Sequence, residues 1–169
     1  MNPQLQHSDW TAAEGAELKT LLIGKRLRVA AAESMTAGRV QALLGAVSGA
    51  SGYLAGGVTA YRGDLKVSLL GVDPAGERDN WVSAQVATEM ALGACRMFEC
   101  EIGVATTGYA EPDAAGGIEV PLAWWAVCGP EDAVRTGRVE FPGASGRTEV
   151  QARVTVAAMR GLLAAMRGE

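Results

Sequence analysis

Residues 27–39 read Leu27-Arg28-Val29-Ala30-Ala31-Ala32-Glu33-Ser34-Met35-Thr36-Ala37-Gly38-Arg39. A run of small and branched apolar residues ends here in the polar segment Glu-Ser-x-Thr-x-Gly, and a helix-like spacing of apolar residues follows it. This order predicts a buried strand that enters a helix through a tight turn. In open α/β sheets such a turn lies at the carboxyl edge of the strands, where ligands bind.

Ser34 directly follows the predicted strand, and two roles are open for it. It can be a nucleophile, because backbone N–H groups at the start of the next helix can stabilise an anion beside it. Alternatively, Ser34 or Thr36 only caps the helix, as serine and threonine commonly do in such turns. The turn alone does not decide between a catalytic and a structural serine.

Length and composition restrict the class of protein. The 169 residues suffice for one domain with one core, and the 49% hydrophobic content excludes a disordered chain. The net charge of −4 argues against a nucleic-acid partner, which would require a basic surface. The sequence contains no run of 18 apolar residues and no apolar signal segment. We therefore expect a cytoplasmic protein with a small-molecule partner and no membrane partner.

Histidine and cysteine restrict the possible chemistry. The single histidine, His7, lies within residues 1–8, which we expect to be flexible. A Ser-His-Asp triad and a histidine-rich metal site are therefore not expected. The three cysteines form no CxxC pair, so we predict neither a zinc site nor a disulfide framework, and no metal or cofactor. A nucleophilic Ser34 would need a lysine, a tyrosine or a carboxylate as its base.

The remaining apolar patterns predict the other elements. Helices are expected over residues 10–23, 40–48, 63–70, 84–98 and 148–166. Strands are expected over residues 29–32, 58–61, 101–106, 122–127 and 134–141. Residues 49–57 are predicted to form a glycine-rich loop, which lacks the Gly-Lys-Ser/Thr ending of a P-loop. Residues 1–169 are thus predicted to form a single-domain α/β protein, a three-layer sandwich with a mixed sheet flanked by helices, and a homo-oligomer.

Lys66 lies on the predicted helix 63–70 and shares a face with Arg62, Leu69 and Leu70. A like charge and apolar neighbours both lower the pKa of an amine. An ordinary pKa near 10.4 would have to fall by about three units for Lys66 to act as a base at pH 7. The simpler interpretation is a solvated surface lysine.

Arginines mark both ends of the last predicted helix. Arg147 lies at its start, where it forms either an anion site together with the helix terminus or a lone exposed arginine. Arg153, Arg160 and Arg167 are spaced by seven residues and predict a stripe that faces solvent or a partner.

Several motifs occur along the chain in an order that resembles one known family. They are Glu33-Ser34-Met35-Thr36-Ala37-Gly38, Gly56-Gly57-Val58-Thr59-Ala60-Tyr61, Lys66, Leu70-Gly71-Val72, Val82-Ser83, Thr107-Gly108-Tyr109-Ala110-Glu111-Pro112, and Phe141-Pro142-Gly143 with Arg147. In this order they resemble the CinA C-terminal domain family of competence/damage-inducible proteins, whose characterised members are nicotinamide mononucleotide deamidases. The resemblance covers nearly the whole chain.

The resemblance implies hydrolysis of the nicotinamide carboxamide, which releases ammonia and leaves nicotinate mononucleotide. It implies that Ser34 is the nucleophile, Lys66 its base and Tyr61 an assisting hydrogen-bonding group. It also implies that the N–H groups of the turn hold the oxyanion and that Arg147 meets the phosphate of a pyridine nucleotide. The other substrate-binding residues that it implies are Glu33, Thr36, Gly57, Thr107 and Gly108.

The sequence departs from the family pattern near the site. Met35 replaces a cysteine, and Ala37 replaces a glycine and restricts the backbone of the turn. Glu111 replaces a glycine and would place a carboxylate where the resemblance implies that an anionic nucleotide approaches. Ile118 and Gln151 stand where the family has threonine and arginine. Two alternatives stay open: a catalytically silent relative that binds a small ligand or a protein partner, and a hydrolase of an uncharged amide.

Overall fold

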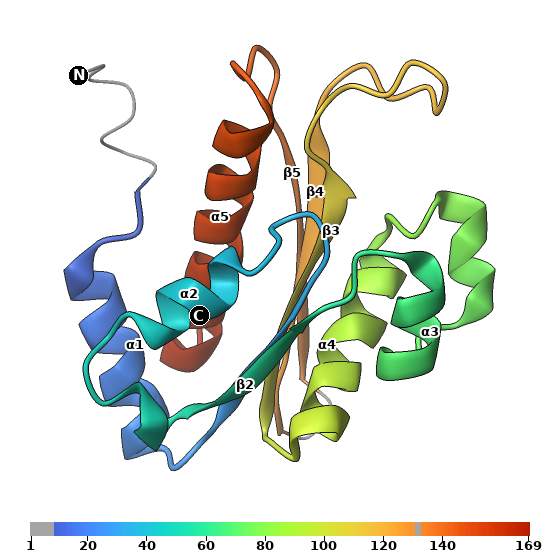
Figure 1. Cartoon of the computed structure of the whole chain (residues 1–169). Coiled ribbons are helices and arrows are strands. Elements are labelled where there is room, and N and C mark those ends of the chain that lie inside the picture. The colour runs from blue at the N-terminus through green and yellow to red at the C-terminus, as the bar shows by residue number, and fades with distance from the viewer. Residues whose placement is uncertain (1–8, 131–132) are drawn as a thin grey trace.

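A five-stranded mixed sheet separates two layers of helices (Figure 1). The computed structural model describes residues 9–130 and 133–169, so the expectations for residues 1–8 and His7 lie outside the described residues. The strand order is β2-β1-β3-β4-β5, with β2, β1 and β3 parallel and with β4 and β5 antiparallel to their neighbours. The strands are β1 Val29–Glu33, β2 Leu54–Thr59, β3 Ile102–Tyr109, β4 Leu122–Cys128 and β5 Val134–Glu140. The predicted α/β class and mixed sheet are confirmed.

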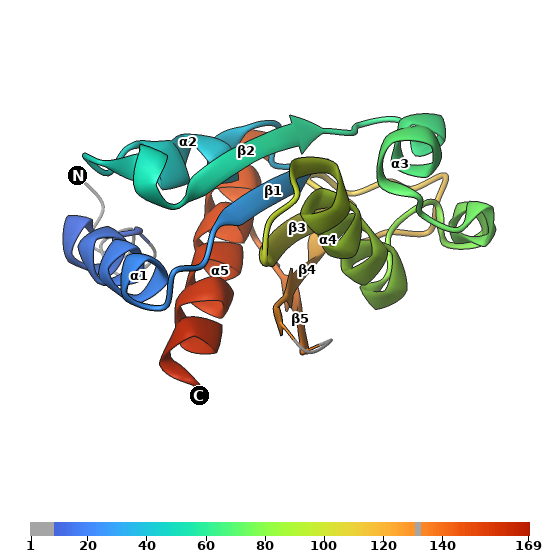
Figure 2. The same cartoon turned by 90° about the horizontal axis from the view of Figure 1, so that it is seen from below.

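Helices cover both faces of the sheet (Figure 2). The helices on one face are α1 Ala12–Gly24, α2 Arg39–Gly45 and α5 Arg147–Arg167. The helices on the other face are α3 Gly63–Leu70 and α4 Ala84–Phe98, and the short 3-10 turns are η2 Ala50–Gly52 and η3 Pro74–Asp79. In the described part of the chain, every helix is too short or too polar to cross a membrane.

Strand β1 explains why two apolar layers form. Its side chains alternate, so Val29 and Ala31 contact the α1, α2 and α5 layer, whereas Ala30 and Ala32 contact the α4 layer. All four residues are fully buried. A central strand with both faces covered must be apolar throughout, which is why this run has no alternation of polar residues.

The structure corrects the predicted glycine-rich loop. Strand β2 begins at Leu54, so Gly56 and Gly57 lie inside a strand rather than in a loop. Gly57 pairs with Ala31 of β1 and lies against the Gln41 side chain of α2, where a Cβ atom would overlap that side chain. Backbone pairing with β1 and the close approach of α2 therefore outweigh the low strand propensity of glycine.

Element ends also differ from the prediction. Strand β3 continues through Thr107 and Gly108 to Tyr109, because β4 pairs with it along this whole segment. Helix α1 begins at Ala12, where Thr11 and Glu14 form a reciprocal capping box, rather than at residue 10. Helix α2 ends at Gly45, before the predicted end near residue 48.

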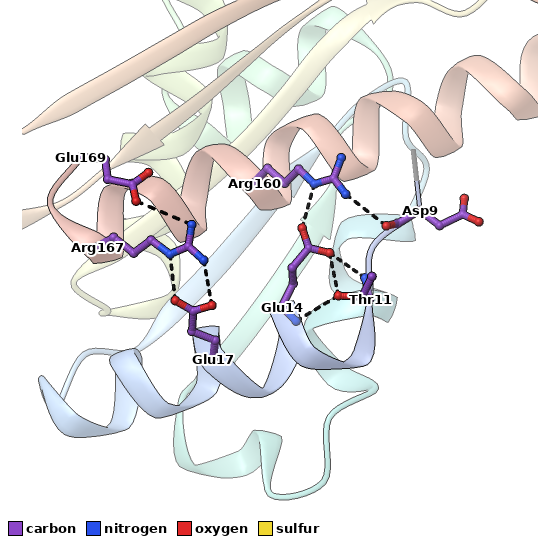
Figure 3. Close-up of polar contacts among 7 residues, drawn as sticks. All are labelled: Asp9, Thr11, Glu14, Glu17, Arg160, Arg167 and Glu169. Carbon is purple, nitrogen blue, oxygen red and sulfur yellow. Dashed lines mark hydrogen bonds and ion pairs between the residues drawn. The ribbon is translucent and has the colours of Figure 1, made fainter. Parts of the chain in front are cut away.

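Two arginines of α5, Arg160 and Arg167, form ion pairs with residues of α1 (Figure 3). Arg160 Nε lies 2.8 Å from Glu14 Oε1, and Arg167 donates two hydrogen bonds of 2.8 Å to the Glu17 carboxylate. Arg160 also lowers the pKa of Glu14 to about 2, chiefly through its hydrogen bond. Arg160 and Arg167 face solvent, as the stripe predicts, but both also form ion pairs with α1, which packs beside α5.

Candidate active site

Ser34 and Lys66 meet at the carboxyl edge of the parallel strands. Lys66 Nζ donates a hydrogen bond to Ser34 Oγ at 3.0 Å and another to the Tyr61 carbonyl oxygen at 3.2 Å. Ser34 is 6% exposed and Lys66 is 3% exposed. The simpler interpretation of Lys66 as a solvated lysine is therefore wrong, since α3 turns its Lys66 and Leu70 side toward the interior.

Burial gives Lys66 the electrostatics of a base. Desolvation lowers the pKa of Lys66 to about 8. At pH 7 roughly one tenth of the amine is then neutral, compared with about one part in 2,500 for an ordinary lysine. A neutral amine at hydrogen-bonding distance from a hydroxyl can accept its proton, and this arrangement can generate a serine nucleophile.

Glu33 organises the turn that carries Ser34. Its carboxylate accepts the Thr36 hydroxyl at 2.7 Å. It also accepts three backbone N–H groups near the start of α2, at 2.9–3.1 Å, from Gly38, Val40 and Gln41. Glu33 and Thr36 are both fully buried. The structure thus places these two expected substrate-binding residues beneath the turn, where their contacts hold its shape.

Two backbone N–H groups of the turn have no hydrogen-bond acceptor among the described residues. The Ser34 N–H donates to the Thr106 carbonyl at 3.0 Å, and the Ala37 N–H donates to the Ser34 carbonyl at 3.2 Å. The Met35 and Thr36 N–H groups donate no hydrogen bond to any described residue. Of the turn amides, Met35 and Thr36 are therefore the candidates for an oxyanion hole.

The cleft beside Ser34 consists of two adjoining pockets. The nucleophile pocket has a volume of about 340 Å³ and is lined by Ser34 and Lys66, among others. The outer pocket has a volume of about 220 Å³ and is lined by Glu111, Asp113 and Arg147, among others. The walls that the two pockets share are formed by Met35, Tyr61, Gly108 and Tyr109. A substrate with two arms can therefore occupy both pockets.

Asn80 and Trp81 also line the nucleophile pocket, although they were not predicted as site residues. Both adopt left-handed backbone angles, with φ values of 48° and 63°. The Trp81 indole lies against Gly63, where a Cβ atom would overlap it, and the Trp81 carbonyl accepts the Thr107 hydroxyl at 2.6 Å. Asn80 donates to the Tyr109 hydroxyl at 3.0 Å. These contacts arise between distant segments, so no local pattern marks the two residues.

The other expected binding residues separate into two groups. Thr107 and Gly108 line the nucleophile pocket, as a contact with substrate requires. Gly57 is not among the lining residues of either pocket and lies in the interior of β2. The structure thus brings Thr107 and Gly108, but not Gly57, to the cleft beside Ser34.

Arg147 is held at the mouth of the cleft by two partners. Its Nη1 lies 3.0 Å from Glu111 Oε2, and its Nη2 donates to the Tyr61 hydroxyl. The alternative of a lone exposed arginine is therefore wrong. Tyr61 contributes its carbonyl to Lys66 and its hydroxyl to Arg147, so it connects the base with the outer pocket.

Comparisons with known proteins agree with this architecture. The CinA-like protein of Chlorobaculum tepidum is 40% identical over 150 residues, which are 85% of this chain and 35% of that protein. The CinA-like protein of Mycolicibacterium paratuberculosis is 39% identical over 166 residues, which are 91% of this chain and 37% of that protein. The chain thus spans about a third of the length of these curated relatives.

Solved structures show the same fold. A competence-damaged protein (CinA) superfamily protein from Enterobacter cloacae has a TM-score of 0.84 and 25% identity, and the match covers 90% of each chain. The competence/damage inducible protein CihA from Agrobacterium tumefaciens has a TM-score of 0.79 and 26% identity, and the match covers 94% of this chain and 98% of that chain. Residues 12–166 match the model of the CinA C-terminal domain, and the chain belongs to this family.

Proposed function

We propose that this chain is an amidohydrolase that hydrolyses the carboxamide of nicotinamide mononucleotide or of a related pyridine amide. The observation that carries this proposal is the 3.0 Å hydrogen bond between the buried Lys66 amine and Ser34 Oγ. The pair lies at a cleft, and its lysine has a pKa of about 8. Nucleophile, base and cleft together are the parts that acyl transfer requires.

The first half of the reaction forms an acyl-enzyme. Neutral Lys66 accepts the Ser34 proton while Oγ attacks the carboxamide carbon, and the Met35 and Thr36 N–H groups stabilise the resulting oxyanion. The C–N bond then breaks, and the protonated Lys66 gives its proton to the departing nitrogen, which leaves as ammonia. The products of this half are ammonia and a Ser34 ester of the pyridine carboxylate.

The second half releases the acid. Neutral Lys66 accepts a proton from a water molecule, whose oxygen attacks the ester carbon, and the protonated lysine returns a proton to Ser34 Oγ as the ester bond breaks. The reaction consumes one water and restores the free enzyme. Lys66 donates one hydrogen bond to Ser34 and another to the Tyr61 carbonyl. The bond to the Tyr61 carbonyl keeps Lys66 oriented through both halves of the reaction.

The walls of the nucleophile pocket favour an aromatic amide. Tyr61, Trp81 and Tyr109 all line it. Aromatic side chains supply flat apolar surface and bind planar rings by stacking or edge contacts. The Thr107 hydroxyl donates a hydrogen bond of 2.6 Å to the Trp81 carbonyl, which fixes the segment that carries the indole.

Ammonia release from nicotinamide mononucleotide tests the proposed function. We expect turnover by the purified chain and its loss in both Ser34→Ala and Lys66→Ala. Ser68→Ala, which changes an exposed serine on the same helix as Lys66, is the matched control and should keep full activity. No ammonia from the folded wild type, or ammonia that persists in both variants, would exclude the Ser-Lys mechanism for this substrate.

One observation favours the uncharged-amide alternative. Glu111 already forms an ion pair with Arg147, the residue expected to bind a substrate phosphate. An amide without a phosphate needs no contact with Arg147, so its hydrolysis should survive Arg147→Ala. Parallel assays of nicotinamide and nicotinamide mononucleotide with this variant separate the two readings.

A further inference from the structure

Two arginines of the described chain line the cleft, and both already bind a carboxylate. Arg147 Nη1 lies 3.0 Å from Glu111 Oε2 in the outer pocket. Arg62 lines the nucleophile pocket, and its Nε donates to Asp64 Oδ1 at 3.0 Å. Neither guanidinium therefore presents an unshared positive charge to a ligand.

The outer pocket carries more negative than positive side chains. Within residues 9–130 and 133–169, its charged lining residues are Glu111, Asp113 and Arg147, which are two carboxylates and one guanidinium. Arg147 donates a second hydrogen bond, from Nη2, to the Tyr61 hydroxyl. The lining of the outer pocket thus resembles a site for a neutral or cationic group.

A phosphate in the outer pocket would have to compete with Glu111. If the phosphate displaced the Glu111 carboxylate from Arg147, that carboxylate would stay in the same loop, close to the new anion. Like charges at such a distance repel each other, and Asp113 would add to the repulsion. This repulsion weakens the binding of the phosphate group only and does not affect the binding of the carboxamide end of the substrate.

On the basis of the proposed function, we infer that Glu111 determines specificity and directs the enzyme toward pyridine carboxamides without a phosphate. The substrate class is an uncharged or cationic amide, for which an N-ribosyl pyridinium carboxamide is the model compound. Its ring and carboxamide occupy the nucleophile pocket beside Ser34, and its sugar reaches the outer pocket. The Glu111–Arg147 pair then stays intact during binding.

Nicotinamide riboside and nicotinamide mononucleotide test this specificity, because they differ only in the phosphate. We expect the wild type to show a kcat/KM for the riboside at least tenfold above that for the mononucleotide. Glu111→Gln and Glu111→Ala should each raise kcat/KM for the mononucleotide and reduce this ratio at least fivefold. Glu119→Gln removes the same charge from an exposed position in the same loop and should leave the ratio unchanged.

The outcomes distinguish the specificity from the chemistry. A wild type that prefers the mononucleotide, with a ratio that neither Glu111 variant changes, would overturn the role of Glu111 and leave the amidohydrolase function in place. Ammonia from neither compound would reject the amidohydrolase function itself. In that event, calorimetry can still measure the selectivity, as the affinities of both compounds for Ser34→Ala. Tighter binding of the riboside than of the mononucleotide supports the role of Glu111, and equal or weaker binding of the riboside overturns it.

Discussion

Lys66 Nζ lies 3.0 Å from Ser34 Oγ, although the two residues are 32 positions apart in the chain. The turn after β1 supplies the serine, and the helix that follows β2 supplies the lysine. Because β1 and β2 are parallel neighbours, the segments after both strands emerge at the same edge of the sheet. The topology therefore brings together a nucleophile and a base that no local motif connects.

The pH dependence of the reaction should report the pKa of Lys66. Only the neutral amine acts as the base, and its fraction rises tenfold per pH unit below a pKa of about 8. We expect kcat/KM for ammonia release to rise with pH up to about 8 and to level off above it. A profile that stays flat between pH 6 and 9 at constant ionic strength would contradict Lys66 as the base.

Lys66→Met should abolish turnover and stabilise the fold. The lowering of the Lys66 pKa from 10.5 to about 8 corresponds to a cost of about 3 kcal/mol for the buried charged amine at pH 7. Between pH 8 and 10.5 the folded state binds fewer protons than the unfolded state, so wild-type stability rises with pH there. Urea denaturation at pH 7 and pH 10 should show a stabilised variant that lacks this rise. Equal pH slopes for both proteins would refute the cost of burial.

Ala37→Gly should stabilise the turn beside the nucleophile. Ala37 has a φ of 52°, in the left-handed region, where a Cβ atom costs roughly 1–2 kcal/mol. Part of this gain is offset by the greater flexibility of glycine in the unfolded chain, so we expect a net increase of about 0.5–1 kcal/mol in the free energy of unfolding. Ala42→Gly, at an exposed position inside α2, should instead destabilise the protein by roughly the same amount.

Glu33→Gln should destabilise the protein and reduce catalysis together. The Glu33 carboxylate is fully buried and accepts hydrogen bonds from Thr36, Gly38, Val40 and Gln41. A glutamine amide replaces one acceptor oxygen by a donor, which leaves buried N–H groups unpaired at a cost of about 2–4 kcal/mol. Thermal unfolding and ammonia release should both show the loss. Full activity with unchanged stability would show that the turn does not depend on Glu33.

Glu14→Gln should loosen the contact between α1 and α5. Glu14 completes the capping box with Thr11 and binds Arg160, so its loss should destabilise the protein by about 1 kcal/mol. The lowered pKa of Glu14, about 2, means that its contribution is present above the ordinary value near 4.5 and is lost as the pH falls toward 2. Urea denaturation at pH 7 and pH 3 measures both effects. If the difference in unfolding free energy between the variant and the wild type were as large at pH 3 as at pH 7, the ion pair with Arg160 would not contribute to stability.

Local signals were sufficient for several elements. The predicted bounds of α3 and α4 are confirmed at both ends. Gly71 adopts a left-handed φ of 67° and ends α3, while the Ser83 hydroxyl accepts the Val86 N–H at 3.2 Å and begins α4. Both signals are hydrogen bonds or backbone angles within a few residues, so the sequence pattern contains them.

Nonlocal contacts explain where the prediction failed. Gly56 and Gly57 have a composition typical of a loop, but pairing with β1 draws them into a strand. The left-handed Trp81 belongs to no motif, because its conformation depends on Gly63, Gly76 and Thr107 around it. Such positions are set by the packing of distant segments, which propensity cannot report.

The sequence by itself determined the apolar strand Val29–Ala32 and the polar turn after it, because these depend on residue type and short spacing. Ser34 and Lys66 became a candidate pair only through the order of motifs along the whole chain, which resembles that of a known family. Only the tertiary structure decided that Lys66 is buried beside Ser34 and that Arg147 is bound by Glu111, 36 positions away. Desolvation lets the lysine act as a base, and ion pairing neutralises the charge that the arginine would otherwise present to a ligand. Both effects arise from neighbours that are distant in the chain, and therefore from the fold.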